Sequence, residues 1–301
     1  MTVKLRHFGR ADDYERVGQF LVTSGTPANR DLNWLRSRWD YMHTHPALDR
    51  TTLDRIGIWE DDGAIVAVAN HEDQLGAVYC HFAPAHRATL AMAAVEYAAQ
   101  HLRGTDDNGA EYLRIYAHSE DDALNAALMA HGFGRDGKAD ATAVMPLQGP
   151  GSIPDATLPA GFRLLSLADQ DDLVKVHRVM WRGFNHTGEP PADGLTDRAL
   201  MQSGRHFRHD LTMIVVAPDG TYASLAGHWY EPVNQTAMVE PVATDPTYRR
   251  LGLGRAAVLA GLRRCAAEGA TKAYVGSEQQ FYYAIGFVPG YRHLRWSRSF
   301  S

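Results

Sequence analysis

The sequence predicts a layered α/β (α+β) fold in which one module of about 140–150 residues is used twice. Three observations lead to this prediction. The chain has 301 residues, 45% hydrophobic and 22% charged, which is typical of a globular protein of about two domains. Short motifs recur in both halves at nearly constant spacing. In the second half, helix-like segments interleave with strand-like runs, as expected around a mixed sheet.

The repeat is clearest in two pairs of motifs. Asp62-Gly63 matches Asp219-Gly220 at an offset of 157 residues, and each pair stands between two strand-like runs. Asp-Gly in this position is a strong β-hairpin signal. Gly132-Phe133 matches Gly286-Phe287 at an offset of 154 residues. The small change in offset indicates insertions or deletions in loops, where they are tolerated best.

The domain boundaries are predicted from the stretch between the two copies. Residues 146–161 contain four Pro together with several Gly and show little apolar periodicity, which is typical of a loop. We therefore expect a first domain over residues 1–147, a linker over 148–160 and a second domain over 161–301.

The second half can be assigned element by element. The expected order is a strand at 162–165, a helix at about 170–184, an irregular stretch, a short helix at about 197–203, strands at 211–217, 222–230 and 238–244, a helix at about 253–268, a strand at 272–275, a short helix from Ser277, and a last strand or hairpin within 291–300. Gly269 is a favourable residue for ending the long helix. Ser277 and Gln280 have the spacing of a capping box.

Composition argues against several classes of function. The net charge is −5, whereas a nucleic-acid binder usually has a basic domain. Two cysteines are too few for a disulfide framework or a four-ligand zinc site, and the closely spaced His pairs have no third ligand nearby. No apolar run approaches about 18 residues, and the N-terminus lacks the apolar region of a signal peptide. We expect a cytoplasmic protein without metal, nucleic-acid or membrane partners.

The segment Arg249–Arg255 (RRLGLGR) carries the strongest functional signal. It joins a strand-like run to the start of an amphipathic helix. Free N–H groups and the positive end of the dipole make a helix N-terminus a phosphate site, and Gly residues let the backbone approach the anion. The segment lacks the Gly-Lys-Ser/Thr ending of a P-loop. Its match to a dinucleotide fingerprint is weak, because Ala257 takes the third Gly position and no convincing acidic residue follows.

Two motifs together resemble the GNAT superfamily of acyl-CoA N-acyltransferases. The pattern R-x-x-G-x-G after a strand, within MVEPVATDPTYRRLGLGRA, is similar to the pyrophosphate-binding loop of that family. In FYYAIGF, Tyr282 stands four residues before Gly-Phe, where the family usually has a Tyr. The resemblance covers residues 162–300 well and residues 1–145 only through the repeat. It implies two tandem GNAT-like domains, each a mixed, mostly antiparallel sheet flanked by helices.

The resemblance implies that acetyl-CoA is the co-substrate. The strand Val242–Thr244 would bind the pantetheine arm, and backbone N–H groups near residues 250–255 would hold the pyrophosphate. The residues expected to bind the cofactor are Val242, Ala243, Thr244, Arg249, Arg250, Leu251, Gly252, Leu253, Gly254 and Arg255. The acyl carbonyl would lie near the N–H of Val242, polarised as in an oxyanion hole.

Glu240 and Tyr282 are the candidate catalytic residues. An attacking ammonium must lose a proton, and Glu240 lies two residues before Val242, on the same face of the strand. By resemblance, Tyr282 would protonate the leaving thiolate. The alternatives are a structural hydrogen bond for Glu240 and a packing role for Tyr282.

The first copy lacks these residues. In the sequence alignment of the two copies, Leu90 and Met92 replace the two glycines, Val78 replaces Glu240 and Leu128 replaces Tyr282. We therefore expect the first domain to be a degenerate, non-catalytic copy that packs on the second and shapes its acceptor pocket. A retained but altered acyl-CoA site is the alternative.

The predicted function is transfer of an acetyl group from acetyl-CoA to a primary amine of a small molecule, by direct attack in a ternary complex. An aromatic group is a candidate lining of the acceptor pocket, with core or interface packing as the alternative: Trp181, Phe184, His186, Trp229 and Tyr230. Other possibilities are a non-catalytic acyl-CoA sensor and, among enzymes, a mycothiol-synthase-like or an aminoglycoside acetyltransferase. The protein is expected to be a monomer or a homodimer.

Overall fold

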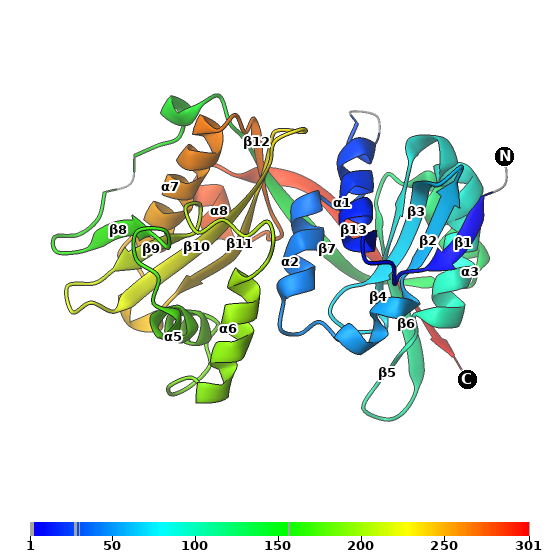
Figure 1. The fold of residues 1–301 in the computed structure, drawn as a ribbon, viewed down its shortest axis with the longest axis horizontal. Helices are drawn as coiled ribbons and strands as arrows, with labels where there is room; N and C mark the ends of the chain where they lie inside the picture. Colours follow the sequence, from blue (N-terminus) through cyan, green and yellow to red (C-terminus); the bar gives the residue numbers. More distant parts are fainter. Residues whose placement is uncertain (1–2, 27–28, 30, 156, 301) are drawn as a thin grey trace. The chain divides into compact units, whose positions relative to one another are not determined.

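The computed structural model describes residues 3–26, 29, 31–155 and 157–300. The chain divides into two compact units. Unit 1 comprises Met1–Met42, Ala47–Ala141 and Tyr291–Ser301, and unit 2 comprises His43–Pro46 and Thr142–Gly290. Each unit is a mixed sheet with helices on both faces, which confirms the predicted fold class (Figure 1). In the described part of the chain, no helix is long and apolar enough to cross a membrane.

Unit 2 has a sheet in which only β11 and β12 are parallel. Its elements are β8 (Arg163–Ser166), α5 (Leu173–Gly183), η4 (Ala192–Gly194), α6 (Leu195–Gln202), β9 (Met213–Val216), β10 (Tyr222–Glu231), β11 (Thr236–Thr244), η5 (Pro246–Tyr248), α7 (Leu253–Ala267), β12 (Lys272–Val275) and α8 (Gln280–Ala284). The strand order is β12-β11-β10-β9-β8. These bounds agree closely with the elements expected from the sequence.

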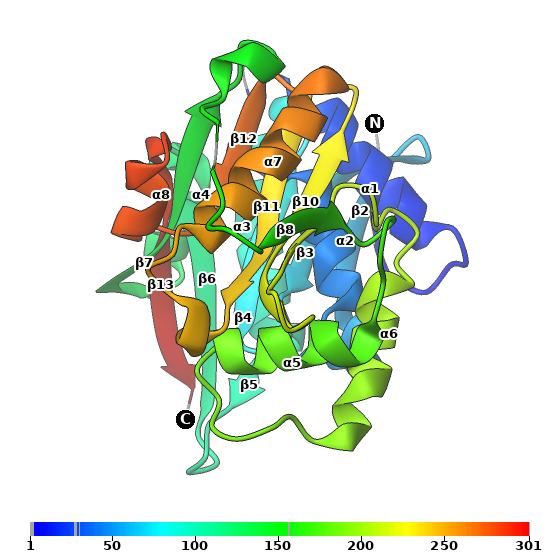
Figure 2. The same cartoon turned by 90° about the vertical axis from the view of Figure 1, so that its left-hand side faces the viewer.

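Two apolar cores lie on the two faces of this sheet, because successive strand residues point to opposite sides. Val215 packs in the core that contains α7 and α8, whereas its neighbours Ile214 and Val216 pack in the core that contains α5. Helix α7 lies across β10 and β11 (Figure 2).

Unit 1 repeats the same plan. Its elements are β1 (Lys4–His7), α1 (Asp13–Ser24), α2 (Arg36–Thr44), η1 (Arg50–Arg55), β2 (Gly57–Asp61), β3 (Ala64–His71), β4 (Ala77–Phe82), η2 (Pro84–His86), α3 (Arg87–His101), β5 (Gly104–Thr105), β6 (Glu111–His118) and α4 (Asp122–Ala130). Here β4 and β6 form the parallel pair that β11 and β12 form in unit 2. Val78 packs in the core with α3 and α4, and Tyr79 packs in the core with α1 and α2.

The predicted tandem repeat is confirmed in its local geometry. Asp62 and Gly63 have φ angles of 48° and 81° and form the two-residue hairpin between β2 and β3. After α4, the N–H of Phe133 donates to the carbonyl of Leu128; after α8, the N–H of Phe287 donates to the carbonyl of Tyr282. Both helices therefore end in the same Schellman-type turn, which makes Tyr282 and Leu128 equivalent.

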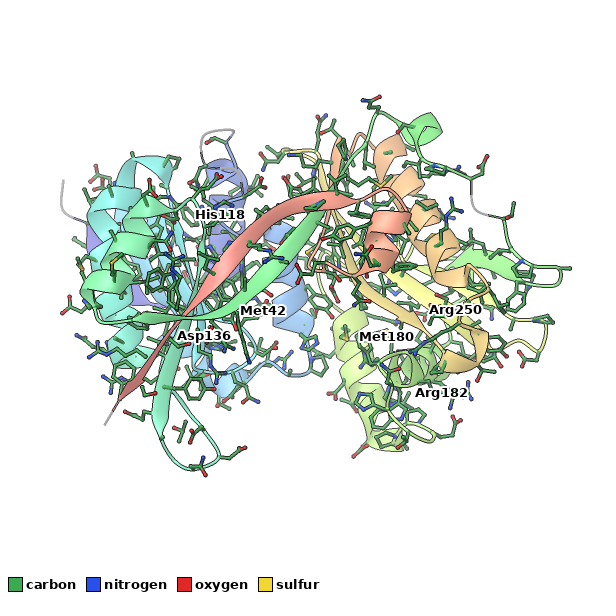
Figure 3. The ribbon with its side chains drawn as sticks, turned by 180° about the vertical axis from the view of Figure 1, so that it is seen from behind. Met42, His118, Asp136, Met180, Arg182 and Arg250 are labelled. Carbon is green, nitrogen blue, oxygen red and sulfur yellow. The ribbon has the colours of Figure 1, made fainter. Side chains whose placement is uncertain are left out.

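The last strand of the first half of the sequence, β7 (Gly134–Pro146), ends in unit 2, and the last strand of the second half, β13 (Val288–Phe300), runs into unit 1. Residues 143–146 of β7 pair with β12 in unit 2, and residues 293–300 of β13 pair with β6 in unit 1. Asp136 lies on β7 (Figure 3). Within unit 1, Nε of Arg295 donates to Oδ2 of Asp136 at 2.6 Å. The two units thus have other bounds than the predicted domains: residues 142–160 fall in unit 2, and residues 291–301 fall in unit 1.

The predicted linker is part of unit 2, and its described residues pack against α7. It contains η3 (Pro150–Ser152), and the side chain of Ile153 is only 2% exposed. The guanidinium of Arg263 on α7 donates to the carbonyl of Ile153 at 2.8 Å and pairs with Asp155. The described residues of this stretch therefore contact α7 in its first turn, through Arg255, and further along, through Arg263.

The predicted capping box at the start of α8 is wrong. The helix begins at Gln280, and its N-cap residue is Gln279. The hydroxyl of Ser277 accepts the N–H of Gln279 at 3.2 Å, in a turn before the helix. A Ser-x-x-Gln pattern is short, and here the turn competes for the same hydroxyl.

His228 of β10 is buried against α7, and it makes the stability of unit 2 depend on pH. Its Nδ1 and Nε2 each lie 3.0 Å from a backbone carbonyl, those of Leu211 and Val258, and a neutral ring donates to one of them at a time. Burial lowers the pKa of His228 from 6.5 to about 4.

We expect acid to destabilise the protein partly through His228. Below about pH 6.5 the unfolded chain takes up a proton that the folded ring does not, so the free energy of unfolding falls until the pH reaches the folded pKa. At pH 5 the loss is about 2 kcal/mol. Urea unfolding at pH 7.5 and pH 5 measures it. His228→Gln should be less stable at pH 7.5 but lose less stability on acidification. Equal losses in the two proteins would place the acid sensitivity elsewhere.

Candidate active site

A bulge in β11 opens the site. Cross-strand pairing runs from Glu231↔Thr236 to His228↔Val239 and resumes at Ala226↔Val242, so Glu240 and Pro241 face Gly227 alone. A Cβ on Gly227 would lie 2.5 Å from the carbonyl oxygen of Glu240, so this close approach requires glycine. A bulge leaves backbone groups of the extra residue outside the ladder and bends the strand.

The strands on the other side of β11 also separate at this level. The parallel pairs between β11 and β12 end at Met238↔Tyr274. Beyond this point β11 continues to Thr244, and β12 leads into the turn before α8. The two ends therefore leave a gap in the sheet that α8 and the loop before α7 border.

The loop before α7 has the geometry of an anion-binding site. Gly252 is the N-cap of α7, with a φ of 77°, a value that side chains rarely adopt. Gly254 is close to two side chains, because a Cβ there would lie 3.0 Å from Oγ1 of Thr244 and 3.5 Å from the ring of Phe281. The first N–H groups of α7 have no partner within the helix, and they form the positive end of its dipole.

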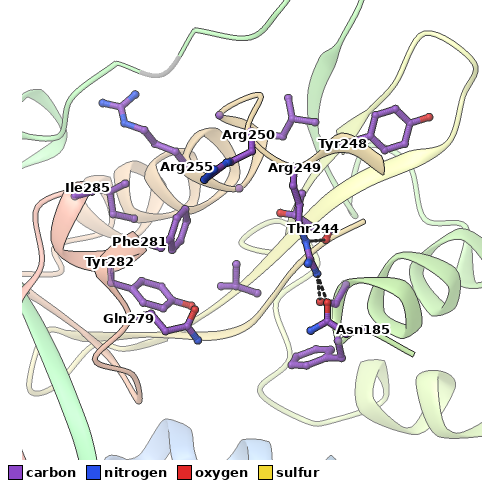
Figure 4. A pocket seen from close by; sticks show the side chains of 17 residues that line it. Asn185, Thr244, Tyr248, Arg249, Arg250, Arg255, Gln279, Phe281, Tyr282 and Ile285 are labelled. Carbon is purple, nitrogen blue, oxygen red and sulfur yellow. Dashed lines mark hydrogen bonds between the residues drawn. The ribbon is translucent and has the colours of Figure 1, made fainter. Parts of the chain in front are cut away.

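These parts line one pocket of about 670 Å³ (Figure 4). Its walls come from the end of α5 (183–185), from β11, from residues 248–255 and from α8 with the residue before it (279–285). Of the ten predicted cofactor residues, the pocket is lined by Val242, Thr244, Arg249, Arg250, Gly252, Leu253, Gly254 and Arg255. Ala243 instead packs in the core with α5, and the side chain of Leu251 is 44% exposed.

The three arginines of the loop differ in their hydrogen-bond partners. Arg249 donates to the carbonyl of Gly183 at 2.9 Å and to Oδ1 of Asn185 at 2.7 Å, so its guanidinium holds the end of α5 (Figure 4). Arg255 donates to the carbonyl of Asp155 at 3.2 Å. Arg250 makes no ion pair or side-chain hydrogen bond among the described residues and is the cation most available to a phosphate.

A buried carboxylate that the sequence analysis did not select fixes this geometry. Asp245 is 1% exposed and accepts the N–H of Thr247 at the start of η5. It pairs with Arg182 of α5 at 2.5 Å and with Arg178 at 3.3 Å. Burial alone would raise the pKa of Asp245, but the hydrogen bonds from Arg182 and Thr247 outweigh it and keep the pKa below its usual value. An Asp before Pro at a helix start is the sequence signal that could have identified this cap.

The charge of Glu240 acts on Tyr282, but of these two residues only Tyr282 is among those that line the pocket. Glu240 is half-buried on β11, and Tyr282 is 8% exposed on α8 and lines the pocket. Burial, with a further contribution from the charge of Glu240, raises the pKa of Tyr282 well above its usual value. Tyr282 therefore keeps its proton at neutral pH, as a general acid must.

The five predicted acceptor residues do not form one group. Only Phe184, which is 52% exposed, lines the pocket. Trp181 stacks on His186 at the end of α5, with 4.1 Å between ring centroids. Trp229 is buried and donates to the carbonyl of Glu240 at 2.9 Å. Tyr230 belongs with the α7 face, since its hydroxyl donates to the carbonyl of Glu268.

Comparison with known proteins agrees with this geometry. Residues 173–288, which hold every wall of the pocket, match the model of the Acetyltransferase (GNAT) family. Unit 2 is a GNAT acetyltransferase domain. Proteins of this family are acyltransferases that use acetyl-CoA. Among the described residues there is no group of three or more His, Cys, Asp or Glu placed to hold a metal ion.

Relatives of the whole chain are more distant. A mycothiol acetyltransferase from Nocardioides sp. is 27% identical over 197 residues, which is 60% of this chain and 66% of that protein, just under two thirds of its length. A tandem GNAT protein from the clavulanic acid biosynthesis pathway has a TM-score of 0.65 at 16% identity, covering 99% of this chain and 98% of its own. A GCN5-related N-acetyltransferase from Sphaerobacter thermophilus has a TM-score of 0.63 at 14% identity, covering 99% and 95%. The two structures establish the tandem GNAT fold.

The GNAT fold of unit 1 lacks the features that open the site in unit 2. Pairing between β3 and β4 runs without a shift from His71↔Val78 to Ala67↔Phe82, so there is no bulge. Only four residues separate β4 from α3, whereas eight separate β11 from α7.

A buried side chain occupies the start of α3, the helix that corresponds to α7 of unit 2. Arg87, the first residue of α3, is 8% exposed and pairs with Asp121, the N-cap of α4. It also donates to Oδ1 of Asn29 at 2.7 Å and of Asn33 at 2.9 Å. An internal cation with three partners thus joins the starts of the two helices, in place of a loop open to a ligand.

One equivalence drawn from the sequence is wrong. The last parallel pair is Tyr79↔Tyr116 in unit 1 and Met238↔Tyr274 in unit 2, so the residue two positions later is His81 in one and Glu240 in the other. Val78 is therefore not the counterpart of Glu240. The conclusion that unit 1 lacks this carboxylate still holds. Burial lowers the pKa of His81 well below its usual value, so the ring is neutral.

Proposed function

We propose that unit 2 transfers an acetyl group from acetyl-CoA to a primary amine of a small molecule. One observation supports this most strongly: the bulged strand, the glycine-rich helix start and Tyr282 line a single pocket. The helix start would bind a phosphate, the bulged strand would bind an acyl carbonyl, and Tyr282 would protonate a leaving thiolate.

The cofactor would bind through backbone groups. The N–H groups at the start of α7 would hold the pyrophosphate, with Arg250 adding a cation. Val242 and Thr244 would present the edge of β11 to the pantetheine arm, as an added strand would be bound. Arg249 would act indirectly, because its guanidinium is engaged by Gly183 and Asn185.

The chemistry would be a direct attack in a ternary complex. Glu240 would take a proton from the ammonium, and the neutral amine would attack the acyl carbon. The N–H of Val242 would donate to the carbonyl oxygen as negative charge develops on it. When the C–S bond breaks, Tyr282 would give its proton to the thiolate, and the nitrogen would release its second proton, which would restore the Tyr282 hydroxyl, so the products are an amide and CoA.

Unit 1 would serve as a non-catalytic partner of this domain. The missing bulge, the short connection before α3 and the buried Arg87 all argue against a second acetyl-CoA site of the same kind. A mycothiol-type amine is the first acceptor to test, because of the mycothiol acetyltransferase relative. Aminoglycosides are the second class.

A thiol-release assay tests the proposal. The full chain is mixed with acetyl-CoA and a panel of small amines, including a mycothiol precursor and aminoglycosides, and free CoA is measured with a thiol reagent. We expect acceptor-dependent release together with one acetylated amine by mass spectrometry. Tight acetyl-CoA binding without release for any amine would support the alternative, an acyl-CoA sensor. An absence of acetyl-CoA binding would overturn both.

A further inference from the structure

Trp229 of β10 contacts β11 through a hydrogen bond at the point where β11 is bulged. Its side chain is 4% exposed, and its indole Nε1 donates to the carbonyl oxygen of Glu240 at 2.9 Å. That carbonyl belongs to the pair of residues that face Gly227 alone. A bulge takes the extra residue out of the regular ladder, and here the indole supplies a donor to its carbonyl.

We infer that Trp229 is a positioning residue that holds the acyl-binding bulge in its working shape. Two groups depend on this shape: the carboxylate of Glu240 and the N–H of Val242, which stand on either side of Pro241. The indole fixes the carbonyl between them, and the close approach of Gly227 allows no other residue there. The inference rests on the proposed function, because the bulge serves the acyl group only in an acyl-CoA site.

Unit 1 supports the inference as an internal comparison. Trp229 pairs across the strands with Met238, and Asn70 pairs with Tyr79, so Asn70 is its counterpart. The side chain of Asn70 donates to the carbonyl of His71 and does not reach across to β4. The strands of unit 1 pair without a shift. The indole and the bulge therefore occur together in unit 2, and neither is present at the equivalent positions of unit 1.

The surroundings of Trp229 leave room for a substitution that removes only the hydrogen bond. The indole packs edge-on against Phe207, with 6.0 Å between ring centroids and an angle of 79° between the ring planes. Trp229→Phe keeps an aromatic ring in this position and removes the N–H donor. Replacement by 3-benzothienylalanine keeps the full shape of the indole and also removes the donor.

The test compares the affinities of acetyl-CoA and CoA by calorimetry, so that no acceptor is needed. Both ligands use the phosphate loop, but only acetyl-CoA offers a carbonyl to Val242. Wild type should bind acetyl-CoA more tightly than CoA. In Trp229→Phe the affinity for CoA should change by less than about threefold, whereas the preference for acetyl-CoA should fall by about fivefold or more, the effect of one buried hydrogen bond. The benzothienyl variant should behave in the same way.

Trp39→Phe is the matched control. Trp39 is also buried, and it donates to the carbonyl of Tyr14 at 3.0 Å within the core of unit 1, whereas the pocket belongs to unit 2. It should keep the wild-type preference. Thermal unfolding shows whether each variant is folded. A folded Trp229 variant with an unchanged preference would overturn the inference, as would equal binding of the two ligands by wild type. Wild type that binds neither ligand would instead refute the proposed function.

Discussion

Replacing Gly252 by Asp is expected to abolish acetyl-CoA binding while the protein remains folded. Gly252 caps α7 with a φ of 77°, and a Cβ there would meet no atom within 4 Å, so the new side chain would enter the open pocket. Its carboxylate would stand where the pyrophosphate is proposed to bind. Repulsion between like charges about 4 Å apart is of the order of several kcal/mol near a protein surface, which corresponds to a loss of affinity of at least about 100-fold.

Gly252→Asn separates charge from shape. Asn has nearly the same size as Asp, and both adopt left-handed backbone more readily than other side chains do. Calorimetry should therefore show a modest loss of affinity for Asn and an almost complete loss for Asp, with similar unfolding midpoints. Equal losses in the two variants would indicate a steric effect. Unchanged affinity in Gly252→Asp would remove the phosphate loop from the proposed site.

Replacing Glu240 by Gln is expected to lower the rate of acetyl transfer about 100-fold near neutral pH, the usual contribution of a general base. The change keeps the size of the side chain and removes its basicity. The defect should shrink as the pH rises toward the pKa of the amine, about 10 for an alkyl amine, because a deprotonated amine needs no base. Acetyl-CoA affinity should change little, since the phosphate loop is unaltered.

A pH series of kcat/KM measures this effect, with the best acceptor from the amine panel. Glu120→Gln is the control, because it makes the same chemical change at an exposed position in unit 1. It should leave the profile as in wild type. A defect in Glu240→Gln that is the same at every pH would mean that Glu240 shapes the site without acting as a base.

The glycine-rich loop could be found in the sequence because its function depends on local chemistry. A strand, a turn and two glycines before an amphipathic helix specify a helix N-terminus that is open to an anion, whatever surrounds it. Of the seven cofactor residues predicted within Arg249–Arg255, six line the pocket, all except Leu251. Tyr282 was selected through the resemblance of its motif to the family, and the turn formed by Gly286 and Phe287 follows its helix as that motif implies.

The roles of the arginines and aromatic residues could not be predicted in this way. Arg249 looks like a phosphate ligand in the sequence, but Gly183 and Asn185, more than 60 positions earlier, engage its guanidinium. Trp229 and Tyr230 are neighbours in the chain and point to opposite faces of β10. Only one of the five proposed acceptor residues, Phe184, lines the pocket. Such roles depend on long-range contacts, which the spacing of residues does not encode.

The sequence alone determined the tandem α/β plan, the order of elements and the loop before α7, because hydrophobic periodicity, turn residues and glycines act over a few positions. The tertiary structure decided which strand completes which sheet, as β7 and β13 show. It also decided which positions of the two copies are equivalent: His81, and not Val78, is the counterpart of Glu240. Strand pairing joins residues far apart in the chain, and a bulge of one residue changes the face on which each later side chain lies.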